Sequence, residues 1–188
     1  SDGIRKFGNS ADLVSNSGEL DRRQIPYMAI NLEPVFAPIE TYSKPLDDAV
    51  TQMQALTALE PLVICHSMGG LAVRNWLRAE SADARVHRIV TIGTPHSGTR
   101  LSDGMSQLRW MANADQMRFE NAWLIELARQ EHRSRRSRFV CFYSDCDNIV
   151  FPAASATLPD ADNRHVAGVS HLTLAIDKAV REQSLELL

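Results

Sequence analysis

Residues 61–70 read Pro-Leu-Val-Ile-Cys-His-Ser-Met-Gly-Gly, and this stretch decides the fold expected for the chain. An apolar run of strand type is followed by a serine between small or tightly turning residues, and then by a helix-forming stretch. This order predicts a strand, a sharp turn and a helix with Ser67 at the apex, the arrangement called a nucleophile elbow. Such a turn exposes the Ser67 hydroxyl and directs the Met68 backbone N–H, at a helix N-terminus, toward the position of an oxyanion.

One position of the elbow departs from the usual Gly-x-Ser-x-Gly pattern, because Cys65 stands where the first glycine belongs. The glycine normally provides room at a crowded turn. Since cysteine is also small, we expect slight crowding and a working elbow.

The composition fits one globular domain over residues 1–188. Of the 188 residues, 44% are hydrophobic and 23% are charged, which is enough apolar material for a sizeable core. The net charge of −3 argues against strong non-specific binding to nucleic acids. No apolar stretch approaches the roughly 20 residues of a membrane-spanning helix. The three cysteines show neither a disulfide framework nor metal-site spacing with histidines, so we expect no metal and no cofactor.

Short apolar runs alternate with helical patterns along the chain. Strands are expected over residues 27–31, 62–65, 88–92, 138–143 and 164–169. Helical spacing is found at Leu46, Val50, Met53 and Leu56, and a closing helix is expected over residues 172–187. This alternation predicts an α/β fold with a mostly parallel sheet flanked by helices.

A serine nucleophile needs a base that accepts its proton and an acid that orients the base. In nucleophile-elbow enzymes the chain order is serine, acid, histidine, and such groups lie at the carboxyl ends of parallel strands. Asp145 and Asp147 both follow the expected strand 138–143; we select Asp147 because it lies farther into the loop, with Asp145 as the alternative. His171 follows the last expected strand and is the predicted base. The competing interpretation makes Asp147 a turn residue and His171 a helix-start residue without a catalytic role.

A third motif, Gly-Thr-Pro-His-Ser-Gly-Thr at residues 93–99, follows the strand 88–92. It begins at the carboxyl end of that strand, so the loop should line the same site. His96 precedes the acid in the chain, and we interpret it as a loop-ordering or pocket-wall residue. We interpret His66, directly before Ser67, as a packing or hydrogen-bonding residue.

Four motifs in this order resemble the bacterial triacylglycerol lipase and esterase family of α/β-hydrolases. They are Cys-His-Ser-Met-Gly-Gly (65–70), the 93–99 loop, Tyr-Ser-Asp-Cys-Asp (143–147) and Gly-Val-Ser-His (168–171), and the segment 29–36 is also similar. The resemblance implies an α/β-hydrolase fold with Ser67 as nucleophile, His171 as base and Asp147 as the residue that orients it. It further implies hydrolysis of acyl or lipid esters through an acyl-enzyme.

Two other functions stay open. An acyltransferase or a thioesterase would use the same triad, because the fold does not separate these reactions. The alternative of a different class is a non-catalytic binding module that has kept the triad residues. The sequence predicts neither a compartment nor an oligomeric state.

Members of the resembling family carry a strand that ends in His-Gly, and the loop after it donates the second N–H of the oxyanion hole. No segment before Tyr27 has this pattern, so we expect an N-terminally truncated member that lacks the strand. The loss of one oxyanion donor typically lowers the rate by about 10²–10³-fold. The chain alone is therefore expected to be less active and less stable than a version with the strand.

Residues 99–133 are expected to flank or cover an acyl pocket, as a lid would. Methionine and tryptophan suit a flexible apolar chain. Two further residues, Phe151 and Leu172, flank the predicted acid and base. The predicted substrate-binding residues are Met105, Leu108, Trp110, Met111, Phe151 and Leu172. Ordinary helix packing is the competing interpretation for each of them.

Overall fold

The computed structural model describes residues 14–79, 82–100 and 112–188 of the chain. The described strands are β1 (Leu62–His66), β2 (Arg88–Ile92), β3 (Phe139–Tyr143) and β4 (Asp162–His165). The described α-helices are α1 (Val14–Arg22), α2 (Ser43–Thr57), α3 (Met68–Trp76), α5 (Ala112–Gln116), α6 (Ala122–Arg129), α7 (Arg133–Arg136), α8 (His171–Ile176) and α9 (Lys178–Leu185). Short 3₁₀ turns are η1 (Ile39–Tyr42), η2 (Ala82–Arg85) and η4 (Ala153–Ala156).

Within these residues the strands form one parallel sheet in the order β1-β2-β3-β4. In its register Cys65 pairs with Thr91, and Thr91 pairs with Cys141. The carboxyl ends of the strands therefore meet at one edge. The elbow, the 93–99 loop and the loop after β3 that carries Asp145 and Asp147 (the acid loop) all begin at this edge. The predicted α/β fold with a mostly parallel sheet is confirmed.

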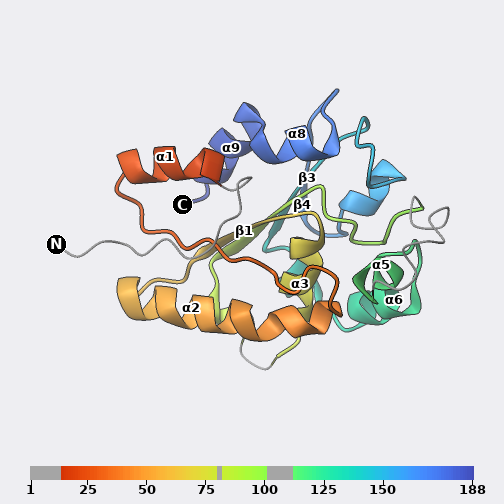
Figure 1. Cartoon of the computed structure of the whole chain (residues 1–188), viewed down its shortest axis with the longest axis horizontal. Coiled ribbons are helices and arrows are strands. Elements are labelled where there is room, and N and C mark those ends of the chain that lie inside the picture. Colours follow the sequence, from red (N-terminus) through yellow and green to blue (C-terminus); the bar gives the residue numbers. More distant parts are fainter. Residues whose placement is uncertain (1–13, 80–81, 101–111) are drawn as a thin grey trace.

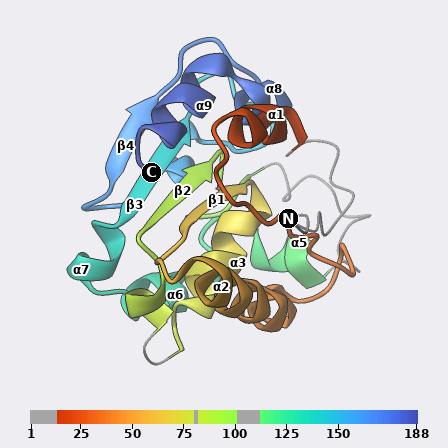
Figure 2. The ribbon, with the colours of Figure 1, turned by 90° about the vertical axis from the view of Figure 1, so that its left-hand side faces the viewer.

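The sheet lies between two helical layers, with α2, α3 and α6 on one face and α1, α8 and α9 on the other (Figures 1 and 2). Neighbouring residues of a central strand face opposite layers, as the strand period of two requires. On β2, Ile89 joins the core cluster on the α2 and α3 side, whereas Val90 packs in the cluster that contains Leu174 and Val180. None of the described helices has the length and apolar character needed to cross a membrane.

The strand predicted over residues 27–31 is wrong. This segment has no regular secondary structure, although Ile30 and Leu32 pack against the core. Among the described residues β1 pairs with β2 only, and the segment forms no ladder with the free edge of β1. β1 is therefore an edge strand of the described sheet.

Two predictions for the C-terminal part are also corrected. The strand predicted over 164–169 is β4, which ends at His165, and Gly168 with a φ of 74° turns the chain before α8. The single helix predicted over 172–187 is interrupted at Asp177, whose side chain accepts hydrogen bonds from the N–H groups of Ala179 and Val180. Asp177 is thus the N-cap of α9, and it starts a second helix.

The predicted buried face of α2 is correct for its first half. Leu46 and Val50 are buried, whereas Leu56 in the last turn is 69% exposed. The helix ends one residue later, at Thr57, and is followed by its C-cap Ala58 with a φ of 57°.

Candidate active site

Ser67 occupies the sharp turn between β1 and α3. Its φ of 53° and ψ of −129° lie in a region that residues with a side chain rarely adopt. The Ser67 N–H donates to the carbonyl of Ile92 at 2.9 Å, and the Ser67 carbonyl accepts from the Thr94 hydroxyl at 2.8 Å. The turn is therefore held by β2 and by the loop that follows β2.

Cys65 fits the position where a glycine is usual. Its side chain is buried, and its thiol lies 3.3 Å from the carbonyl oxygen of Val90. Burial raises the pKa of this thiol, so the sulfur stays protonated. Across the turn, a Cβ added at Gly69 would lie only 3.3 Å from the Cys65 Cβ. The glycine at position 69 thus accommodates the extra atoms of Cys65.

The acid loop after β3 and the start of α8 bring Asp147 and His171 together. Asp147 Oδ2 lies 2.8 Å from His171 Nδ1, and the two side chains are 2% and 4% exposed. The other carboxylate oxygen, Oδ1, accepts from the N–H groups of Ile149 and Val150, each at 2.8 Å.

These contacts fix the protonation of the pair. Burial alone would raise the pKa of the Asp147 carboxyl, but the hydrogen bonds from His171 and from the two backbone N–H groups hold this pKa below its usual value. The carboxylate is therefore ionised at neutral pH. An ionised acceptor places the proton of a neutral His171 on Nδ1 and leaves Nε2 as the basic nitrogen.

Asp145, the alternative acid, faces a different histidine. Its Oδ1 lies 3.0 Å from His165 Nε2, and its side chain is 64% exposed. The hydrogen bond from His165 lowers the pKa of the Asp145 carboxyl. Of the two aspartates, Asp147 is the one that contacts His171.

The elbow lies next to the Asp147–His171 pair. His66 Nε2 lies 3.1 Å from the carbonyl oxygen of His171, and the centroids of the two imidazole rings are 4.6 Å apart. Gly93 packs against the pair, since an added Cβ there would lie 3.1 Å from His171 Nδ1 and 3.2 Å from Asp147 Oδ2. Among the described residues the Ser67 hydroxyl makes no hydrogen bond, either to His171 or to another group. Such contacts often tighten only when substrate is bound.

Behind the 93–99 loop lies a buried polar network. The His96 Nε2 lies 3.1 Å from the Thr91 hydroxyl, and the His96 carbonyl accepts from Arg74 at 2.9 Å. Arg74 in turn forms a fully buried, bidentate ion pair with Glu131, at 2.7 and 2.8 Å. Burial, and then the charge of Arg74, hold the pKa of His96 well below its usual value. His96 therefore orders the loop, and its position matches one of the two roles expected for it.

The sequence reasoning missed Arg74 and Glu131. Arg74 lies on the apolar elbow helix, and an arginine among buried positions of such a helix is a detectable signal of an ion pair. Its partner lies 57 residues away, which no local pattern reveals.

Met68, the predicted oxyanion donor, is the first residue of α3, so its N–H is among the donors that a helix N-terminus leaves unpaired within the helix. Its side chain contacts Asn113, whose Nδ2 lies 3.1 Å from the Met68 sulfur and donates to the Val35 carbonyl at 2.6 Å. Asn113 was not predicted; it joins α5 to the segment before η1 beside the elbow.

The predicted substrate-binding residues divide into two groups. Met105, Leu108, Trp110 and Met111 lie outside the described residues. Phe151 and Leu172 are described and are 59% and 69% exposed, beside the acid loop and directly after His171. They present apolar surface at the edge of the candidate site.

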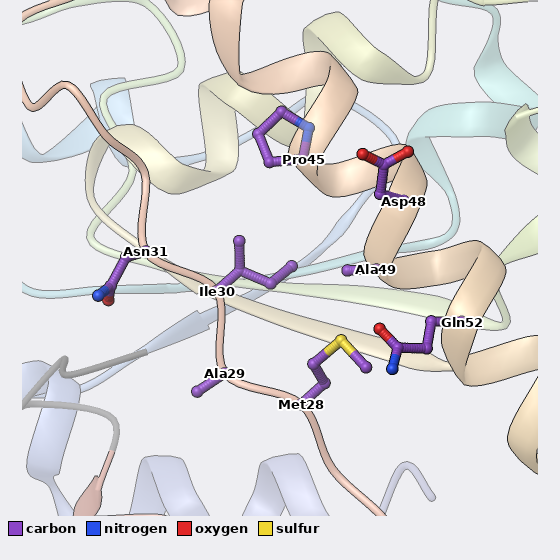
Figure 3. A pocket seen from close by; sticks show the side chains of 8 residues that line it. All are labelled: Met28, Ala29, Ile30, Asn31, Pro45, Asp48, Ala49 and Gln52. Atoms are coloured by element: carbon purple, nitrogen blue, oxygen red, sulfur yellow. The ribbon is translucent and has the colours of Figure 1, made fainter. Parts of the chain in front are cut away.

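A pocket elsewhere on the molecule is lined by none of the predicted catalytic or substrate-binding residues. It lies between the segment 28–31 and α2, as Figure 3 shows. Its lining side chains on α2 are Pro45, Asp48, Ala49 and Gln52. In the part of the chain that the structure describes, no group of three histidine, cysteine or acidic side chains is placed to hold a metal ion.

Comparison with known proteins gives one family and many similar folds. The model of the family described as PGAP1-like alpha/beta domain matches residues 42–179, a range that includes Ser67, Asp147 and His171. No curated protein sequence matches the chain significantly.

Among solved structures, the product of the gene lin2722 from Listeria innocua is 15% identical with a TM-score of 0.67, over 97% of this chain and 90% of that chain. The mature form of Bacillus licheniformis lipase BlEst2 is 15% identical with a TM-score of 0.73, over 96% and 84%. Aspergillus fumigatus lipase B is 19% identical with a TM-score of 0.73, over 90% of this chain but 47% of that chain. At these identities the likeness establishes the fold.

Proposed function

The chain belongs to the family of PGAP1-like alpha/beta domains, within the α/β-hydrolase superfamily, and on this premise we propose that it is a serine hydrolase that cleaves carboxylic esters through an acyl-enzyme. The observation that carries the proposal is the buried Asp147–His171 contact of 2.8 Å at the sheet edge where the strained Ser67 lies. A buried, ionised carboxylate that orients an imidazole is what general-base catalysis requires.

In the proposed reaction Ser67 attacks the ester carbonyl while His171 Nε2 accepts the hydroxyl proton. Asp147 stabilises the resulting imidazolium through Nδ1, and the Met68 N–H donates to the oxyanion of the tetrahedral intermediate. The imidazolium then protonates the departing alcohol, and the acyl group stays on Ser67 as an ester. Water, deprotonated by His171, attacks this ester and releases the acid, so the enzyme returns to its initial state.

The proposed substrates are small-molecule acyl or lipid esters. Phe151 and Leu172 expose apolar side chains beside the acid and the base. In the proposed complex the acyl chain of the substrate extends from the reacting carbonyl over these side chains. Two of the similar structures are of proteins named lipases. We extend the proposed acyl-binding surface to Met105, Leu108, Trp110 and Met111 on their sequence alone.

A fluorophosphonate probe tests the proposal, because it reacts covalently with an activated serine. We expect stoichiometric labelling that is lost in Ser67→Ala and retained in the matched control Ser137→Ala, whose hydroxyl bonds to the Ser134 carbonyl in an exposed turn. A panel of p-nitrophenyl esters of rising acyl length then measures the chain preference. A folded wild-type protein that the probe does not label would contradict the proposal and favour a binding module.

A further inference from the structure

We propose that Thr94 is a positioning residue that holds the nucleophile in its reactive conformation, through the hydrogen bond from its hydroxyl to the Ser67 carbonyl. The inference rests on the proposed serine hydrolase function. Thr94 is fully buried, so it lies beneath the site and does not touch substrate. Its role would be to act through Ser67.

The backbone of Ser67 needs support from outside the elbow. A residue with a side chain at a φ of 53° is in a strained conformation, which persists only when its surroundings enforce it. Two contacts outside the elbow enforce it, the 2.9 Å bond of its N–H to the Ile92 carbonyl and the 2.8 Å bond from Thr94. The other bond to the Ser67 carbonyl, from the Gly70 N–H at 3.2 Å, lies within the elbow and α3. Thr94 is thus the side chain that fixes the carbonyl from outside.

The elbow helix α3 leaves space for the Thr94 side chain at Gly70. A Cβ added at Gly70 would lie 2.3 Å from the Thr94 Oγ1 and 2.7 Å from its Cγ2. Glycine inside a helix is less favourable than alanine, so its presence needs a packing reason. The close approach of Thr94 supplies that reason.

The same loop touches the proposed base, His171. Gly93, next to Thr94, packs directly against the Asp147–His171 pair. His96 lies two residues after Thr94, and its carbonyl is fixed by Arg74, which forms an ion pair with Glu131. The 93–96 segment is therefore anchored from behind and contacts both halves of the site. A rigid segment of this kind sets the separation between the nucleophile and the base.

The variant Thr94→Val tests the role, because valine keeps the shape and removes the donor. We expect kcat and the rate of fluorophosphonate labelling to fall by roughly 10- to 100-fold, since small misplacements of reacting groups cost about this much. KM should stay unchanged because Thr94 does not touch substrate. Thr94→Ser keeps the hydroxyl and should recover most of the lost rate.

The matched control is Thr57→Val, which removes a 2.8 Å hydroxyl-to-carbonyl bond of the same kind on α2. Its labelling rate should equal that of the wild type. If Thr94→Val does not fold, Gly70→Ala provides a second variant, because its new Cβ meets the Thr94 side chain.

Thermal unfolding of each variant separates stability from positioning. A folded Thr94→Val, or a folded Gly70→Ala, that is labelled at the wild-type rate would overturn the positioning role. Loss of rate in Thr94→Val that Thr94→Ser does not recover would also overturn it, since the hydroxyl would then not be the cause. Absence of labelling in the wild type itself would overturn the proposed function and this inference together.

Discussion

The acid loop holds two aspartate–histidine contacts that start two residues apart in the sequence and differ in almost every other respect. Asp147 meets His171 at 2.8 Å and Asp145 meets His165 at 3.0 Å, so distance hardly separates them. The first pair is buried and its carboxylate accepts two further backbone hydrogen bonds, whereas the Asp145 side chain is 64% exposed.

The comparison shows that burial and supporting hydrogen bonds, rather than contact alone, define a candidate catalytic pair. An exposed ion pair is screened by water and contributes little to stability or to orientation. A buried carboxylate with three donors is fixed in one orientation, and it fixes its histidine in turn.

The largest difference between the pairs is expected from replacing the histidines. His171→Ala should lower kcat/KM by about 10⁴-fold or more, because removal of the base disables the nucleophile. His165→Ala should leave kcat/KM near the wild-type value. Esterase assays on both folded variants check this, and a comparable loss in His165→Ala would contradict the assignment.

Replacing the aspartates should give the next largest contrast. Asp147→Asn removes the charge that stabilises the imidazolium, and a loss of roughly 10³–10⁴-fold in kcat is expected from the corresponding change in other serine triads. Asp145→Asn changes an exposed group and should have little effect on kcat. Equal losses in the two variants would show that the loop as a whole, and not Asp147, supports the base.

A glycine lies near each pair and provides a finer contrast. Gly93→Ala places a Cβ about 3.1 Å from His171 Nδ1 at a residue with a φ of 56°, whereas Gly168→Ala adds similar backbone strain, at a φ of 74°, with nothing within 4 Å of its Cβ. Both variants should lose stability, by about 1 kcal/mol from the left-handed conformation. Gly93→Ala alone should also lose activity, by roughly tenfold. The melting temperature and kcat of the two variants check this, and equal kcat values would contradict it.

The smallest effect concerns pH. The Asp147 carboxyl has a folded-state pKa below its ordinary value of 3.8, so it stabilises the fold above that pH, and this contribution disappears as the pH falls through the folded pKa. Asp147→Asn should therefore reduce the loss of stability on acidification below about pH 4. Asp145 has a lowered pKa as well, but its exposure screens the contribution. Urea unfolding at a series of pH values checks the contrast. It would be contradicted if Asp145→Asn changed the pH dependence of the free energy of unfolding more than Asp147→Asn does.

The sequence predicted much of this region because its signals are local. The apolar runs of β1, β2 and β3 each end at a motif, so the positions of Ser67, Asp147 and His171 along the sheet edge followed from chain order. The choice of Asp147 over Asp145 followed from its position in the loop, and the structure places that residue against His171.

The features that the sequence analysis missed depend on contacts between distant residues. Gly70 and Thr94 fit together across 24 positions in the chain, and a glycine in a helix does not indicate which side chain it admits. The segment 27–31 has strand-like residues but pairs with no strand of the described sheet, which only the assembled sheet reveals. The missed break at Asp177 is an exception, because its signal is local: an aspartate before Lys-Ala-Val is an ordinary N-cap.

The central claim is that Ser67 is activated by the buried pair and not by the exposed one. Mass-spectrometric mapping of a fluorophosphonate adduct, timed in the wild type, Asp147→Asn and Asp145→Asn, tests it most directly. We predict that the adduct lies on Ser67, forms equally fast in the wild type and Asp145→Asn, and forms about 10³-fold or more slowly in Asp147→Asn. An adduct on another serine, or equal rates in the two aspartate variants, would contradict the claim.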